Sequence, residues 1–197
     1  MLGWMDNWQY ASKLPTSPWR GQMTIPREIT LKTFPDGIRL VQKPAGIFDK
    51  AGKPTSSTPN ARSFEMTAVL GIGSAREAGW KLDFGNDAFV LIGYNATRHE
   101  VFVDRIHSGL VAFSRDFPVR VSAPLPQIGS ALDFRVLIDR NSVELFAAGG
   151  RVTLTNFVFP PSTAPPHIEF FSDRAARQSA LTIRSLNNIR ASTLKDK

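Results

Sequence analysis

The fold of this chain can be inferred from residues 134–147, which read Phe134-Arg135-Val136-Leu137-Ile138-Asp139-Arg140-Asn141-Ser142-Val143-Glu144-Leu145-Phe146-Ala147. Apolar side chains recur at every second position on both sides of a polar tetrad, residues 139–142. Since side chains alternate between the two faces of a strand, this period predicts two half-buried strands. Asp and Asn suit the tight turn between them, because their side chains can bond to nearby backbone groups. The stretch therefore predicts an antiparallel hairpin.

The same period of two recurs along residues 62–190. Alternating apolar positions are found in the following runs: Phe64 to Leu70, Trp80 to Phe84, Phe89 to Tyr94, Val101 to Val103, Val152 to Leu154, His167 to Phe171 and Leu181 to Ile183. Turn residues separate these runs at intervals of about 8–12 positions, which is typical of a β-sandwich or barrel. A short helix over residues 172–178 is the one helical element we expect within this stretch.

Composition excludes several classes of protein. Among 197 residues there is no cysteine, so disulfides, thiolate metal sites and cysteine nucleophiles are excluded. No apolar run approaches the roughly 20 residues that span a bilayer, and we expect no membrane partner. Residues 1–10 have neither a basic start nor an apolar run, so we expect no signal peptide and leave the compartment open. The net charge is +7, but charges of both signs alternate, so we expect no nucleic-acid partner.

Two segments of the chain contain long and unusual motifs. The first contains Gly3-Trp4-Met5-Asp6-Asn7-Trp8-Gln9-Tyr10-Ala11 and the long run Pro15-Thr16-Ser17-Pro18-Trp19-Arg20-Gly21-Gln22-Met23-Thr24-Ile25-Pro26-Arg27-Glu28. The second comprises residues 102–105 with 108–109, together with residues 137–146 and 149–155. Both segments resemble the glycoside hydrolase family 32 enzymes, which are invertases, inulinases and levanases. The resemblance covers nearly the whole chain and is most specific in residues 3–28 and 134–155.

The resemblance implies an all-β fold, an antiparallel two-sheet β-sandwich preceded by a remnant of a β-propeller blade. Residues 1–43 would correspond to the end of the last of five blades, and residues 44–61 to a linker. Residues 62–190 would form the C-terminal sandwich, and residues 191–197 a frayed tail. In the family a catalytic propeller accompanies this sandwich in the same chain, and such a parent enzyme could be secreted or periplasmic.

Hydrolysis in this family depends on three carboxylates that the resemblance does not locate here. The nucleophile comes from a Trp-x-Asn-Asp-Pro-like motif, a stabilising Asp from Arg-Asp-Pro, and the acid/base from a Glu-Cys pair, and none of these motifs is present. The nearest match, Arg115-Asp116-Phe117-Pro118, lies in the sandwich, where Asp116 is interpreted as a surface charge. We therefore expect no catalytic residue, no cofactor and an inactive chain. His99, His107 and His167 are isolated, so we also expect no metal site.

Sugar-binding candidates come from the aromatic start and from the family-like hairpins. The Trp that corresponds to Trp4 lies beside the fructose pocket in the family. Arg105, Asp139 and Glu144 are further candidates, because charged side chains can form strong hydrogen bonds with sugar hydroxyls. The alternative for Asp139 is the turn already described, and for Trp8, Tyr10 and Trp19 it is packing of the blade or of its contact with the sandwich. Trp80 is expected in the core.

Three functions remain open at this stage. The chain could be the non-catalytic sandwich module of a fructan- or sucrose-degrading β-fructosidase, with a structural and in addition a fructan-binding role. It could be a free-standing fructan-binding module. It could also associate with a separate catalytic propeller, or with itself, through exposed blade strands.

Overall fold

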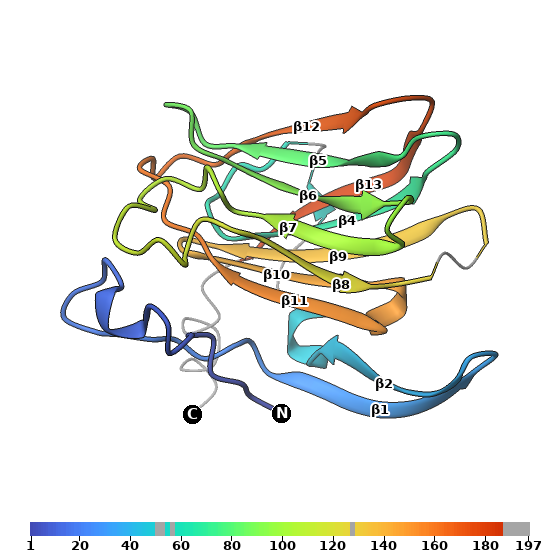
Figure 1. The fold of residues 1–197 in the computed structure, drawn as a ribbon, viewed down its shortest axis with the longest axis horizontal. Coiled ribbons are helices and arrows are strands. Elements are labelled where there is room, and N and C mark those ends of the chain that lie inside the picture. Colours follow the sequence, from blue (N-terminus) through green and yellow to red (C-terminus); the bar gives the residue numbers. More distant parts are fainter. Residues whose placement is uncertain (50–53, 56–57, 127–128, 187–197) are drawn as a thin grey trace.

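A computed structural model describes residues 1–49, 54–55, 58–126 and 129–186 (Figure 1). The expected tail over residues 191–197 lies outside the described residues, as do residues 187–190 of the expected sandwich. Within the described residues, no helix is long and apolar enough to cross a membrane.

Two antiparallel sheets form the predicted sandwich. The six-stranded sheet has the order β11 (Val152–Phe157), β10 (Ser142–Ala147), β9 (Leu132–Asp139), β4 (Phe64–Gly71), β13 (Arg177–Ser185) and β3 (Pro54–Thr55). The five-stranded sheet has the order β12 (His167–Ser172), β5 (Glu77–Asp83), β6 (Phe89–Asn95), β7 (Glu100–Asp104) and β8 (Arg120–Pro124). The expectation of an all-β sandwich is thus confirmed.

The core between the sheets is formed by the alternating apolar positions. Phe134, Val136 and Ile138 of β9 are buried among side chains of both sheets. Trp80 of β5 is fully buried, as expected, with its ring centroid 5.2 Å from that of Phe134. Its Nε1–H donates to Oε1 of Gln178 at 2.7 Å, so the indole satisfies its one polar group inside the core.

The hairpin expected at residues 134–147 is confirmed as β9 and β10. Asp139 pairs with Ser142, so Arg140 and Asn141 form the turn, and Oδ1 of Asp139 accepts a bond from the backbone N–H of Arg140 at 2.8 Å. All six residues of β10 are buried, which alternation alone does not predict. The additional burial arises because a further part of the chain covers the outer face of this sheet.

The helix expected over residues 172–178 is wrong. β12 ends at Ser172 and β13 begins at Arg177, with a bend between them. The physical reason is Asp173, whose Oδ1 accepts bonds from the backbone N–H groups of Arg76 and Glu77 at 2.8 and 3.1 Å. These bonds tie the bend to the start of β5 and exclude a helical path.

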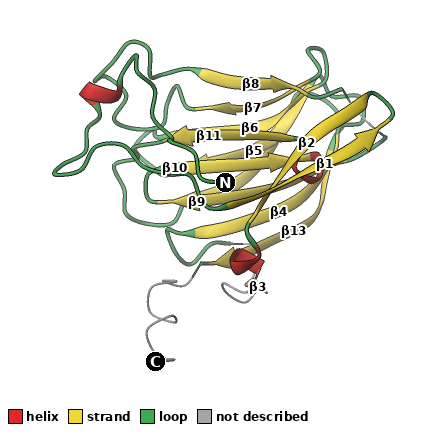
Figure 2. Cartoon of the chain, turned by 90° about the horizontal axis from the view of Figure 1, so that it is seen from below, coloured by secondary structure: helices red, strands yellow, loops and turns green. Residues whose placement is uncertain are grey.

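Residues 1–44 form a separate layer against the six-stranded sheet. They contain the short 3-10 helix η1 (Ala11–Lys13) and the two-stranded hairpin β1 (Arg27–Phe34) and β2 (Gly37–Pro44). Figure 2 shows this hairpin lying across the strands of the sandwich. The expected linker over residues 44–61 also contains a second 3-10 helix, η2 (Gly46–Asp49), and the short strand β3.

Candidate functional site

A buried ion pair joins the N-terminal layer to the sandwich. Nη2 of Arg27, at the start of β1, lies 2.6 Å from Oε2 of Glu144 on β10, and both residues are buried. The backbone N–H of Ile25 donates to the other oxygen, Oε1 of Glu144, at 2.9 Å. The Arg27 guanidinium also lies over the ring of Phe146, 5.1 Å from its centroid. Both carboxylate oxygens of Glu144 are therefore engaged in holding the N-terminal layer.

Two opposing effects act on the pKa of Glu144 in this pair. Burial raises the pKa of Glu144 above its ordinary value, because desolvation penalises the ionised form. The hydrogen bonds from Arg27 and from the backbone of Ile25 act in the opposite direction and favour the carboxylate. Since the net direction is upward, the cost of desolvation outweighs the attraction of Arg27, as is common for buried ion pairs.

An aromatic cluster forms a second junction between the two layers. Met5, Tyr10 and Leu14 pack against Phe117, Phe157 and Phe159. Arg105 lies beneath this cluster, with its guanidinium carbon 4.2 Å from the Phe117 ring centroid and its Nη2 donating to the Tyr10 hydroxyl at 3.2 Å. Only 4% of Arg105 is exposed, so in this structure its charge supports the junction and does not face solvent.

The expectation that Tyr10, Trp8 and Trp19 pack is correct for Tyr10 and wrong for the two tryptophans. Trp8 is 86% exposed and Trp19 is 46% exposed. Trp4 is 47% exposed and lies against Trp8, with ring centroids 5.1 Å apart and planes tilted by 59°. Exposed tryptophan faces of this kind can pack against the C–H side of a sugar ring, so the structure leaves Trp4 accessible for the role expected of it.

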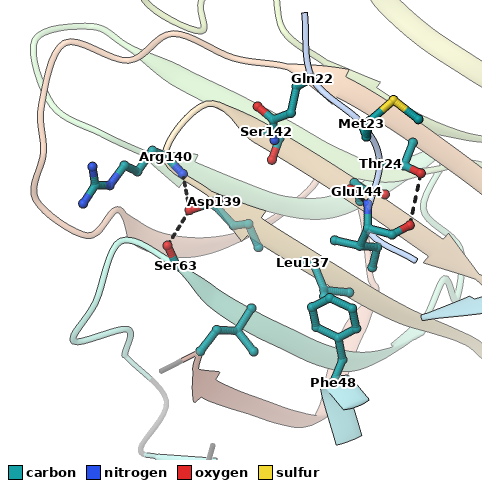
Figure 3. A pocket seen from close by; sticks show the side chains of 13 residues that line it. Gln22, Met23, Thr24, Phe48, Ser63, Leu137, Asp139, Arg140, Ser142 and Glu144 are labelled. Carbon is teal, nitrogen blue, oxygen red and sulfur yellow. Dashed lines mark hydrogen bonds between the residues drawn. The ribbon is translucent and has the colours of Figure 1, made fainter. Parts of the chain in front are cut away.

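A cleft of about 720 Å³ separates residues 22–25 from the outer face of the six-stranded sheet. Figure 3 shows Asp139, Arg140 and Ser63 on one side of it and Leu137 with Phe48 at another. The Ser63 hydroxyl donates to Oδ1 of Asp139, the same atom that accepts the turn bond from Arg140. The expected turn is therefore confirmed, and its carboxylate also lines the cleft.

The structure brings together two of the four expected site residues. Asp139 and Glu144 line the same cleft, whereas Trp4 and Arg105 are absent from its lining. Sequence analysis missed Gln22, Phe48 and Ser142, which also line the cleft. The period of two places Ser142 and Glu144 on one face of β10, which is a signal for Ser142. Gln22 and Phe48 come from distant segments, and nothing in their sequence context links them to this hairpin.

The histidines lie apart from one another. The ring of His107 stacks on Phe89 with centroids 4.9 Å apart, and a ring nitrogen of His99 lies 3.4 Å from the Tyr94 hydroxyl. In the described part of the chain, no group of three or more His, Asp or Glu side chains is arranged to hold a metal ion.

Two family models match the chain. Residues 39–187 match the model described as glycosyl hydrolases family 32 C terminal, and residues 1–44 match the family 32 N-terminal domain. A levanase of Bacillus subtilis (strain 168) is 32% identical over 210 residues, covering 98% of this chain and 31% of the levanase. An extracellular exo-inulinase of Aspergillus awamori is 32% identical over 182 residues, covering 83% of this chain and 34% of the inulinase. The chain thus spans about a third of the length of these curated relatives.

Solved structures with a similar fold come from the same group of fructoside-degrading enzymes. The crystal structure of the Aspergillus awamori exo-inulinase superposes with a TM-score of 0.83 at 29% identity, covering 95% of this chain and 40% of that one. A fructofuranosidase from Schwanniomyces occidentalis, complexed with fructose, has a TM-score of 0.76 at 21% identity, a level that shows the shared fold. In these homologues the domain accompanies a catalytic propeller in the same chain. The chain belongs to glycosyl hydrolase family 32 and consists of that family's C-terminal β-sandwich preceded by a short remnant of its N-terminal domain.

Proposed function

We propose that this chain serves as the non-catalytic sandwich module of a fructan- or sucrose-degrading β-fructosidase, holding the last blade strands of the catalytic propeller. The observation that carries the proposal is the double junction between the two layers. Arg27 and Ile25 are bonded to Glu144, and the Tyr10 cluster packs on the loop that contains Phe117. Such a junction would fix the position of the last blade relative to the sandwich.

The proposal predicts that the chain alone hydrolyses nothing, because the three carboxylate motifs are not among its 197 residues. Purified protein is incubated with sucrose, inulin and levan, and free fructose is measured. A chimera in which the propeller of a related levanase precedes residue 1 is expected to release fructose. Release of fructose by this chain alone, lost on Trp4→Ala, would contradict the proposal.

A second candidate function is association with a separate propeller or with another copy of the chain. It is favoured by the blade hairpin, where Leu31 of β1 is 72% exposed and Ile38 of β2 is 64% exposed. Residues 1–5 pair with residues 22–27, the segment that leads into β1, through bonds such as that from the Arg27 N–H to the Met1 carbonyl at 2.9 Å. An added strand could continue this pairing along β1.

Light scattering over a range of concentrations tests this candidate. We expect the mean mass to rise with concentration and the rise to diminish in Leu31→Lys. Leu110→Lys is the matched control, because Leu110 is 60% exposed and lies in a loop away from the hairpin. A mass that stays monomeric at millimolar concentration would exclude self-association. Mixing with a separately expressed propeller then tests pairing with a catalytic chain.

A third candidate function, fructan binding, is favoured by the exposed Trp4 and Trp8 pair. Affinity electrophoresis in gels containing levan, inulin or no polymer is the direct test. Retardation in one polymer, lost on Trp4→Ala but retained in the matched variant Trp19→Ala, is the expected result. Equal mobility in all three gels would contradict fructan binding, and the structural role would then be the remaining function.

A further inference from the structure

We propose that the cleft between residues 22–25 and β9–β10 is a binding site for a neutral oligosaccharide. This inference rests on the fructan-binding candidate above, and it deepens that candidate by assigning a site separate from the Trp4 and Trp8 pair. The cleft's volume of about 720 Å³ lies within the roughly 300–1,000 Å³ typical of small-molecule sites. It therefore has room for a short sugar chain.

The lining combines hydrogen-bonding groups with apolar walls. Gln22, Ser63, Asp139 and Ser142 provide an amide, two hydroxyls and a carboxylate, and Phe48 with Leu137 provides apolar surface. Sugars present the same combination, hydroxyl groups around a ring with apolar C–H faces. The polar groups would set the orientation of the sugar, while the Phe48 ring would pack against a C–H face.

Several of these polar groups retain unused hydrogen-bonding capacity. Both bonds to the Asp139 carboxylate reach Oδ1, so within the described residues Oδ2 has no hydrogen-bond partner. The Gln22 amide and the Ser142 hydroxyl likewise have no partner in the part of the chain that the structure describes, and Figure 3 shows them side by side at the cleft. A ligand with several hydroxyl groups would satisfy all three.

The charges of the lining favour a neutral ligand over an anion. Among the described residues that line the cleft, Arg140 is the one cationic side chain, and it is accompanied by the carboxylates of Asp139 and Glu144. Glu144 is already paired with Arg27, and Asp139 interacts electrostatically with Arg62, so a single cation, Arg140, remains for an incoming anion. A phosphate or another polyanion would require a cluster of cations, which this lining does not provide.

The cleft is held open by bonds on both sides. On one side, Glu144 binds Ile25 and Arg27, which fixes the segment that carries Gln22. On the other, the guanidinium of Arg184 donates to the carbonyl oxygen of Phe48 at 2.7 Å and to the Glu65 carboxylate. A preformed site loses less conformational entropy when a ligand binds than a site that must be ordered first.

The test uses the full 197-residue chain, labelled with ¹⁵N and titrated with levan-type and inulin-type oligosaccharides, with maltotriose as the control sugar. We expect one of the fructans to shift the backbone amide signals of residues 22–25, 63 and 139–142 together, with a common saturation curve. Asp139→Asn is expected to weaken binding about tenfold, since it removes a charge-assisted hydrogen bond but keeps the turn. Asp87→Asn, at an exposed left-handed turn position, is the matched control and should bind as the parent does.

Gln22→Ala is the second variant and lies outside the turn, so it tests the cleft even if Asp139→Asn fails to fold. If the amide signals of Trp4 and Trp8 alone shifted, the cleft proposal would be overturned, but fructan binding by the chain would still be supported. Absence of shifts with every sugar would overturn both, while the structural role would still be judged by the chimera. Equal shifts with maltotriose would overturn the assignment to fructans.

Discussion

Glu144 and Arg27 show how a single contact decides the docking of a layer. Replacing Glu144 by Ala removes both acceptors of the pair, so the Arg27 guanidinium and the Ile25 N–H are left without their partner. Removing one partner of a buried pair costs about 3–5 kcal/mol, so we expect Glu144→Ala to lower the free energy of unfolding by about that amount. Urea denaturation followed by tryptophan fluorescence measures it.

The double variant Arg27→Met with Glu144→Leu is the matched control for this prediction. Because apolar replacement of both partners avoids the cost of desolvation, we expect it to be close to the parent in stability. A double variant as unstable as Glu144→Ala would show that the pair itself, and not the unpaired charge, supplies the free energy.

Asp173 provides the clearest dependence on pH. The hydrogen bond from Arg76 and those from the backbone of residues 76 and 77 lower the pKa of this carboxyl from 3.8 to about 2. A lowered pKa means that its contribution to stability is present above about pH 4 and is lost as pH falls through 2. We expect NMR titration of the Asp173 side chain to give a midpoint near 2. In Arg76→Ala the midpoint should rise only part of the way toward 3.8, because the backbone bonds from residues 76 and 77 remain, and an unchanged midpoint would contradict the role of the Arg76 side chain.

The contribution of Glu144 to stability depends on pH in the opposite direction. Its raised pKa means that its contribution is greatest below the ordinary pKa of 4.5 and diminishes as pH rises through the higher value of the folded state. As pH falls, the contribution of Glu144 to stability therefore increases above about pH 4.5, whereas that of Asp173 decreases below about pH 4.

At the scale of elements, the pairing of β5 with β6 depends on two facing glycines. Gly79 pairs with Gly93, and a Cβ at position 79 would lie 2.0 Å from the Ile92 carbonyl oxygen and 2.6 Å from the Gly93 Cα. Since these contacts are backbone atoms that cannot turn aside, we expect Gly79→Ala to destabilise the protein by about 3 kcal/mol or more. Thermal denaturation measures the loss.

Gly3→Ala is the control for this prediction. A Cβ there would meet only the Thr24 side chain at 3.5 Å, which is ordinary van der Waals contact. Its stability should remain within about 0.5 kcal/mol of the parent. If Gly79→Ala were equally mild, β5 and β6 would have to separate more readily than their close approach suggests.

At the scale of the whole molecule, the two layers differ in how much of each is buried. The sandwich strands β4, β9 and β10 are mostly buried, whereas β1 exposes most of its residues. Local opening requires less free energy where few side chains are buried. We therefore expect backbone amides of β1 and β2 to exchange with deuterium faster than those of β9 and β10.

Hydrogen exchange followed by NMR or mass spectrometry measures this difference. Arg27→Ala should accelerate exchange in residues 1–44 and leave the core strands of the sandwich unchanged. Equal protection of hairpin and sandwich in the parent protein would mean that the two layers unfold as one unit.

Much of the fold could be predicted from the sequence because its signals are local. Alternation at Phe134, Val136 and Ile138, followed by an Asp- and Asn-containing turn, depends only on neighbouring residues, and the structure confirms both strands and turn. The helix expected at residues 172–178 failed for a non-local reason, since Asp173 bonds to the backbone of residues 76 and 77, at the start of the neighbouring strand β5 and far away in the sequence.

By itself, the sequence determined that the chain is an all-β sandwich of glycosyl hydrolase family 32 with a piece of its N-terminal domain. Strand periodicity and an unbroken motif are both contained in neighbouring residues. Only the tertiary structure decided that Glu144 lies beneath Arg27, 117 positions away in the chain, that Arg105 lies beneath Tyr10, and that Gln22 and Ser142 line the same cleft. Burial and desolvation of a charged side chain depend on which distant segment covers it, and that information is not contained in the pattern around the residue.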